Sequence, residues 1–150
     1  MQLNMFEYSS ASILPVVKTS DGLFILLGRE EGTRARITKR WCAFGGRKKQ
    51  SDMNDPCMTA AREFVEESAN CIPLYEDTHN ILGTEDHIKR IQDRLSKKEY
   101  IARIKLHRKT SKRHAHIVYI VYYEHRLCHI HNFNLVRASQ DACNYILSDK

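Results

Sequence analysis

The sequence predicts a mixed α/β fold, of the α+β kind, in which helices pack on a mixed β-sheet. Strand-like runs occur on both sides of a short acidic helix, and a second one-sided helix precedes the last two predicted strands. The chain has 150 residues, 42% of them hydrophobic, and shows no internal repeat or linker. These values suit a single domain with a real core, which we expect to span residues 1–150.

The first half of the chain predicts three strands. Ser12–Thr19 and Leu23–Gly28 are rich in β-branched and apolar residues, and Ser20-Asp21-Gly22 between them is typical of a hairpin turn. Trp41–Phe44 predicts a short buried strand that Gly45-Gly46 brings to an end. The polar segment before this strand is expected to be exposed.

A helix is predicted next, over about Cys57–Ala69. Asp55 suits its N-cap and Pro56 its first helical position. Small or apolar residues recur at helical spacing and form a face that can pack on a sheet: Cys57, Ala60, Ala61, Phe64, Val65 and Ser68.

The second half predicts two helices and two strands. Glu85–Lys98 carries apolar residues on one side and predicts a helix, whereas Glu99–His107 alternates and predicts a strand. Lys109–His114 predicts a basic loop or hairpin tip. His116–Glu124 is the strongest strand of the chain, and Arg137–Leu147 predicts a closing helix.

The stretch Arg62–Glu67 concentrates three carboxylates in less than two helical turns. Glu63 and Glu67 share a helix face and Glu66 borders it, so their charges repel one another. A divalent cation removes this repulsion, and magnesium prefers hard oxygen ligands together with substrate phosphates. The glycines of Gly45-Gly46 let backbone groups approach an ion or phosphate closely. The pattern predicts a magnesium site for phosphate chemistry, although such a charge run by itself also occurs on solvated helix faces.

The segment Phe44–Asn70 resembles the Nudix box, G-x5-E-x7-R-E-U-x-E-E-x-G-U, in which U is a bulky apolar residue. Gly46 matches the leading glycine, and Arg62–Glu67 matches R-E-U-x-E-E at every defined place. The loop before the helix is two residues longer than the pattern, and Ala69-Asn70 replaces the closing glycine and apolar residue. The first glutamate is absent, and either Asn54 or Asp52 stands at its place, depending on the direction of counting.

The resemblance implies a Nudix-like α/β/α sandwich, with the helix near residues 85–98 as an insertion. It implies hydrolysis of a diphosphate bond in a nucleoside diphosphate linked to another group, with Mg²⁺ or Mn²⁺ as cofactor. The metal ligands would be Gly46, Glu63, Glu66 and Glu67, and Arg62 would orient a glutamate. The general base is either a glutamate of this helix or Glu124.

The excess of basic residues predicts a phosphate-rich substrate. The net charge is +6, and expected substrate-binding residues lie in basic clusters near the carboxylates: Arg47, Lys48, Lys49, Lys112 and Arg113. Capped messenger RNA is the favoured substrate, and the alternatives are a diphosphoinositol polyphosphate or a small nucleotide such as ADP-ribose or a dinucleoside polyphosphate. The Phe-Gly-Gly form is similar to Nudix proteins of large DNA viruses and phages, some of which remove caps. A further alternative is a catalytically inactive Nudix-like module that binds RNA.

The remaining features bear on localisation. No run approaches the roughly 18 apolar residues of a membrane span, and the N-terminus lacks the pattern of a secretory signal. The five cysteines are scattered and odd in number, which favours reduced thiols. We therefore expect an intracellular, cytoplasmic protein without membrane attachment.

Overall fold

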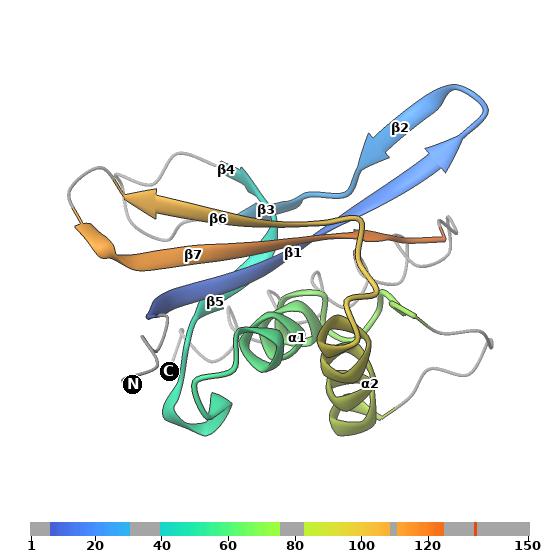
Figure 1. The fold of residues 1–150 in the computed structure, drawn as a ribbon. Helices are drawn as coiled ribbons and strands as arrows, with labels where there is room; N and C mark the ends of the chain where they lie inside the picture. Colours follow the sequence, from blue (N-terminus) through green and yellow to red (C-terminus); the bar gives the residue numbers. More distant parts are fainter. Residues whose placement is uncertain (1–6, 31–39, 76–82, 109–110, 125–133, 135–150) are drawn as a thin grey trace, which may run out of the picture.

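The computed structural model describes residues 7–30, 40–75, 83–108, 111–124 and 134, and its main element is a five-stranded mixed sheet (Figure 1). Its central strand β1 (Tyr8–Thr19) pairs in parallel with β7 (Ser111–Tyr122), which pairs antiparallel with β6 (Ala102–Arg108). Two short strands share the other edge of β1: β5 (Phe44–Arg47) pairs with its first half and β2 (Gly22–Ile25) with its second half.

The smaller elements complete the chain. β3 (Gly28–Glu30) and β4 (Arg40–Cys42) form a separate two-stranded sheet. A 3-10 turn, η1 (Gln50–Asp52), precedes the helix α1 (Pro56–Glu67), and α2 (Thr84–Ser96) follows. The mixed α/β fold class is therefore confirmed, and the second helix lies within two residues of its predicted bounds.

Both described helices lie on the same side of the sheet, as Figure 1 shows, and the core fills the space between these layers. From Ala115 on, β7 points alternate side chains toward the helices, and these are buried, as is Tyr123 just after the strand: Ala115, Ile117, Tyr119 and Val121. From the helix side, Phe64 is fully buried and its ring packs edge-on against Phe44, with centroids 5.3 Å apart. α1 is thereby fixed on the first half of β1 and on β5.

The opposite side of the sheet is more open. Ile104, Leu106 and Tyr122 project there with 40%, 50% and 59% of their surfaces exposed. The closing helix predicted over 137–147 lies outside the described residues.

The region around the glycines differs from the prediction. Trp41 is not buried but 65% exposed, and the chain leaves β4 at Ala43 before entering β5. Gly45 and Gly46 lie inside β5, where they pair with Ser12 and Ala11. Only Phe44 of the predicted buried strand reaches the core, because β4 belongs to the separate two-stranded sheet, where Trp41 pairs with Arg29 and the guanidinium of Arg29 lies over its ring.

The starts of two other strands, β1 and β7, also differ from the predicted ones. β1 begins four residues earlier than predicted, at Tyr8, because the serines before Ile13 pair with β5 and β7. Lys112 and Arg113 belong to β7 and not to a loop, since β6 ends at Arg108 and Ser111 already lies opposite it. Backbone pairing does not require apolar side chains at a strand end, so the basic sequence obscured this boundary.

None of the described helices is long and apolar enough to cross a membrane. Among the described cysteines, Cys57 and Cys71 are free thiols.

Candidate metal and phosphate site

The acidic helix begins as the sequence predicts. Asp55 caps it, accepting a hydrogen bond from the backbone N–H of Cys57 at 2.9 Å, and Pro56 occupies the first turn. The expected inner face is buried, apart from the half-buried Cys57. The opposite edge of α1 therefore carries the glutamates toward β5 and solvent.

Two of the glutamates meet the paired glycines. A Cβ atom placed on Gly46 would lie 2.4 Å from Oε2 of Glu63, so any other residue there would displace that carboxylate. The backbone N–H of Gly45 donates to Oε2 of Glu67 at 2.7 Å. Both residues of the predicted i, i+4 pair thus lie against the same two residues of β5. At Gly45 itself, a Cβ would lie 2.2 Å from that of Ser12, so close strand packing also requires glycine there.

The buried ion pair of Arg62 and Asp52 supports this arrangement from the interior of the protein. Nε and Nη2 of Arg62 each donate to Asp52 at 2.9 Å, and the side chain of Asp52 is 1% exposed. Asp52 also accepts from the backbone N–H of Lys49 at 2.9 Å and from the hydroxyl of Thr59 at 2.7 Å. A carboxylate with this many donors can stay ionised in the interior.

The charge state of this pair follows from its contacts. Burial alone would raise the pKa of Asp52, but hydrogen bonds from Arg62, Lys49 and Thr59 outweigh it and lower the pKa to about 2. The hydrogen bond to Asp52 likewise raises the pKa of Arg62, against the effect of burial. Both groups are therefore charged across the physiological range.

Of the two candidates for the missing first glutamate, the structure brings Asp52 to Arg62. Asn54 is exposed, and its side-chain oxygen accepts from Nζ of Lys48 at 3.1 Å. Asp52 binds Arg62 through both carboxylate oxygens and holds the loop through Lys49. In this chain Asp52 thus links the longer loop to the helix.

Arg62 also reaches the predicted metal ligands. Its Nη1 donates to Glu63 at 2.6 Å and to Glu66 at 3.2 Å, and its Nη2 donates to the carbonyl of Arg47 at 3.0 Å. Its guanidinium therefore fixes two carboxylates and the end of β5 at once. Arg62 thus contacts two of the three glutamates expected as metal ligands.

The donor set suits a hard cation. Glu63, Glu66, Glu67 and the backbone of Gly46 offer oxygen atoms in one region, which is the chemistry that magnesium and manganese prefer. Within the described part of the chain, no three acidic, histidine or cysteine side chains converge tightly enough to hold a metal as they stand. Glu66 and Glu67 are exposed at the helix surface, so their side chains have room to turn toward Glu63.

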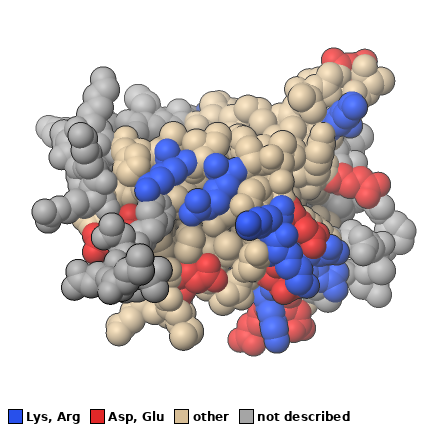
Figure 2. Space-filling view, in the orientation of Figure 1, with Lys and Arg blue, Asp and Glu red and all other residues tan. Residues whose placement is uncertain are grey.

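The predicted substrate-binding residues fall into two groups. Arg47, Lys48 and Lys49 are exposed beside the glutamates, and Nζ of Lys49 lies 3.4 Å from Glu66. Lys112 and Arg113 lie at the start of β7, where their side chains are outside the described part of the structure. Figure 2 shows basic side chains on one face over β6, and others over α2 interleaved with acidic ones.

Glu124 lies apart from the carboxylate cluster. Gly46 is opposite Ala11 of β1, whereas Tyr123 hydrogen-bonds to the carbonyl of Val16. Five residues of strand separate these points, which corresponds to about 16 Å. Glu124 is exposed at the far end of the sheet, so the structure does not bring it to the glutamates of α1.

Sequence reasoning missed a polar chain beneath the site. The hydroxyl of Tyr8 lies 2.8 Å from that of Thr59, which in turn donates to Asp52. Both tyrosine and threonine are fully buried. The one available signal was that Thr59 follows Asp55 by four residues, on the side of α1 that carries Arg62.

The chain matches no protein-family model, no curated protein and no solved structure. The Nudix resemblance thus rests on the motif residues of the sequence.

Proposed function

We propose that this protein is a magnesium- or manganese-dependent pyrophosphohydrolase of Nudix type that cleaves a diphosphate bond in a nucleoside diphosphate derivative. The observation that carries the proposal is the meeting of Glu63 and Glu67 with Gly46 and Gly45, beside the exposed Glu66. A helix edge with three carboxylates against a glycine strand is costly without a cation, and diphosphates bind to proteins through such cations.

The roles of the chain's residues follow from their contacts. Bound metal would supply charge neutralisation for the diphosphate and a water of lowered pKa. Arg62 orients Glu63 and Glu66, and Asp52 holds Arg62 in place. The N–H of Gly45 orients Glu67. A glutamate of α1 is the preferred general base, because Glu124 lies about 16 Å away along β1.

Capped messenger RNA is the favoured substrate. The exposed Arg47, Lys48 and Lys49 lie next to the carboxylates and would attract a polyanion. Diphosphoinositol polyphosphates and small nucleotides share the diphosphate and remain the alternatives.

A hydrolysis panel with and without Mg²⁺ tests this proposal. It should contain capped RNA, a dinucleoside polyphosphate, ADP-ribose and a diphosphoinositol polyphosphate. Release of a nucleoside diphosphate from capped RNA supports decapping, whereas loss of a β-phosphate from the inositol supports the second class. No metal-dependent turnover of any substrate, together with retained RNA binding, would support the inactive RNA-binding module instead.

A further inference from the structure

The helix α2 contacts both ends of α1, the helix that carries the three glutamates. The two helices run antiparallel, so the start of α2 lies beside the end of α1. At one end, the side-chain amide of Gln92 donates to Oδ2 of the N-cap residue Asp55 at 2.8 Å. At the other end, Nδ1 of His87 lies 2.7 Å from Oδ1 of Asn70, shortly after α1 ends. α2 therefore holds α1 at both of its ends.

The end of α1 has an unusual backbone conformation. Ala69 and Asn70 are both left-handed, with φ of 51° and 55°. Asparagine tolerates this conformation, whereas the Cβ of alanine disfavours it. The N–H of Asn70 donates to the carbonyl of Val65 at 2.9 Å, and that of Ala69 to the carbonyl of Glu66 at 3.2 Å. These bonds close the turn that carries Glu66 and Glu67, so this turn depends on contacts that hold Asn70 in place.

His87 holds the segment after α1 through both of its ring nitrogens. The backbone N–H of Leu74 can only donate, so Nε2 of His87, 3.2 Å away, accepts this bond and carries no proton. Nδ1 must then carry the proton of the neutral ring, and it donates to Oδ1 of Asn70. The contacts therefore require a neutral imidazole in a single tautomer.

A second proton on this ring is incompatible with the closed segment. A proton on Nε2 would point at the N–H of Leu74, so that two donors would face each other. His87 and Leu74 are both completely buried, and a buried charge that loses a hydrogen bond is costly. The segment must therefore move away from His87 when the ring is protonated.

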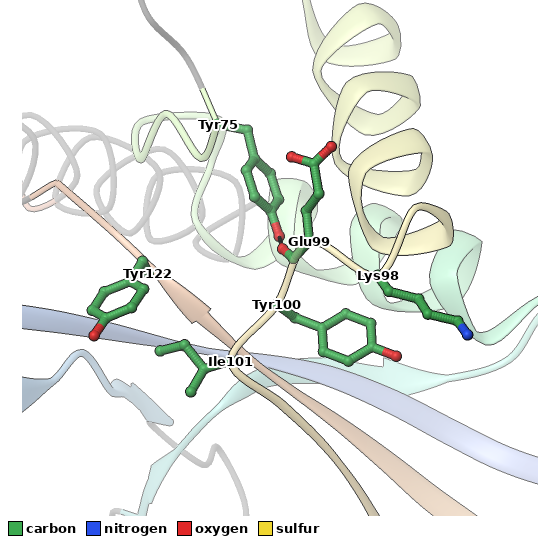
Figure 3. Close-up of a pocket in the computed structure, with 6 residues that line it drawn as sticks. All are labelled: Tyr75, Lys98, Glu99, Tyr100, Ile101 and Tyr122. Carbon is green, nitrogen blue, oxygen red and sulfur yellow. Dashed lines mark hydrogen bonds between the residues drawn. The ribbon is translucent and has the colours of Figure 1, made fainter.

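The far end of the same segment has an anchor of a different kind. The hydroxyl of Tyr75 donates to the carbonyl of Glu99, just after α2, and Figure 3 shows it directed at the backbone of Glu99. Burial raises the pKa of Tyr75, so its hydroxyl keeps its proton. This anchor persists at acid pH, whereas the contacts of His87 depend on the protonation of an imidazole.

The other titratable groups near His87 do not change charge in the same pH range. They lie at the end of α1, in the segment after it and at the start of α2: Glu66, Glu67, Cys71, Tyr75, Glu85, Asp86, Lys89 and Arg90. Burial raises the pKa of the Cys71 thiol, which stays neutral as Tyr75 does. Carboxylates and basic side chains ordinarily keep their charge between about pH 5.5 and about pH 7.5. Among the described residues of this region, His87 is therefore the group that titrates there.

We propose that His87 is a positioning residue of the metal site and makes that site sensitive to acid. The neutral ring holds the last turn of α1, and proton uptake releases this turn together with Glu66 and Glu67. The consequence for catalysis rests on the proposed function, because it requires these glutamates to bind metal. The release itself can be measured without metal or substrate.

The first test is amide hydrogen exchange in the full, metal-free chain, followed by NMR and corrected for the intrinsic pH dependence of exchange. A histidine outside the fold binds its proton below about pH 6.5, so opening should become about tenfold more frequent between about pH 7.5 and about pH 5.5. The protection of the Leu74 amide should fall by this factor. Unchanged protection in the wild type overturns the proposal. Protection of Leu74 equal to that of the β7 amides at the lower pH also overturns it, because the whole fold would then open.

His87→Gln is the informative variant, because its amide oxygen can accept from Leu74 and does not titrate. The protection of Leu74 should then change by less than about twofold between the same two pH values. His107→Gln is the matched control, since His107 is exposed on β6, and it should show the tenfold fall of the wild type. Circular dichroism checks that both variants are folded. A tenfold fall in folded His87→Gln overturns the proposal, and the wild-type result decides it if that variant is unfolded.

A second measurement separates this inference from the proposed function. On a substrate that is hydrolysed, kcat at saturating Mg²⁺ should fall up to about tenfold further in the wild type than in His87→Gln over the same pH range. Parallel pH profiles would contradict the link between His87 and the metal site. If no substrate is hydrolysed, the proposed function fails, whereas a loss of Leu74 protection that His87→Gln abolishes still supports the release of the turn.

Discussion

At the scale of single residues, Asp52 positions other residues of the proposed metal site, although it is not itself one of the proposed metal-binding or substrate-binding residues. It holds Arg62 by two hydrogen bonds and is itself held by Lys49 and Thr59. Arg62 in turn contacts Glu63 and Glu66, so the position of two proposed metal ligands depends on one buried carboxylate.

Asp52→Asn should lower the free energy of unfolding by about 3 kcal/mol, because it leaves the buried charge of Arg62 without its main partner. Ser51→Ala is the control, since Ser51 is exposed in the same 3-10 turn. It should change stability by less than about 0.5 kcal/mol. Urea unfolding measures both, and equal effects would show that Asp52 does not support the loop.

The ion pair of Asp52 and Arg62 also predicts that the free energy of unfolding depends on pH in the acid range. The pKa of Asp52 is about 2 in the folded protein and 3.8 ordinarily, so the unfolded chain takes up its proton at higher pH. The stabilisation is complete above about pH 4 and is lost as the pH falls toward 2, and it amounts to about 2 kcal/mol. Unfolding free energies measured across this range should fall less steeply in Asp52→Asn. Parallel curves would contradict the assigned ion pair.

At the scale of elements, the position of α1 on the sheet places its glutamates. Phe64 is fully buried and packs against Phe44, the first residue of β5. The same strand carries Gly45 and Gly46, which meet Glu67 and Glu63. Core packing and site geometry are thus coupled through one helix and one strand.

Phe64→Ala should destabilise the fold by about 3–5 kcal/mol, since it removes a buried ring and leaves a cavity. Phe64→Leu retains most of the volume and should cost much less. Thermal or urea unfolding measures both variants. An unchanged melting temperature in Phe64→Ala would mean that the ring does not fix α1 on the sheet.

The elements also show which features of the structure could be predicted from the sequence and which could not. The cap, the bounds and the inner face of α1 were predictable because Asp55-Pro56 and the helical period are local signals. The placement of Gly45 and Gly46 within β5 was not, because it depends on pairing with β1, more than thirty residues earlier. The choice between Asp52 and Asn54 also required tertiary structure, since counting along the loop favoured neither.

At the scale of the whole molecule, positive charge surrounds a negatively charged site. The net charge is +6, while the carboxylates of α1 lie beside Arg47, Lys48 and Lys49. Such a surface raises the local concentration of a polyanion without itself stabilising a transition state.

Charge reversal at Lys48 or Lys112 should therefore raise KM and largely preserve kcat. Wild-type kcat/KM for capped RNA should fall steeply with added salt, because many phosphates are engaged, and that for a small nucleotide should fall much less. Kinetics at several salt concentrations measure both slopes. Two equally flat slopes would show that the basic residues serve solubility only.

The central claim is that the glutamates of α1 form a metal site for diphosphate hydrolysis, and Glu67→Gln tests it most directly. The change keeps the shape of the side chain and removes one charged ligand, so stability should be retained. The Mg²⁺-dependent rate on the substrate identified by the panel should fall at least about a hundredfold. Glu85→Gln, at an exposed glutamate in the first turn of α2, should retain the wild-type rate. Full metal-dependent activity in Glu67→Gln would contradict the claim.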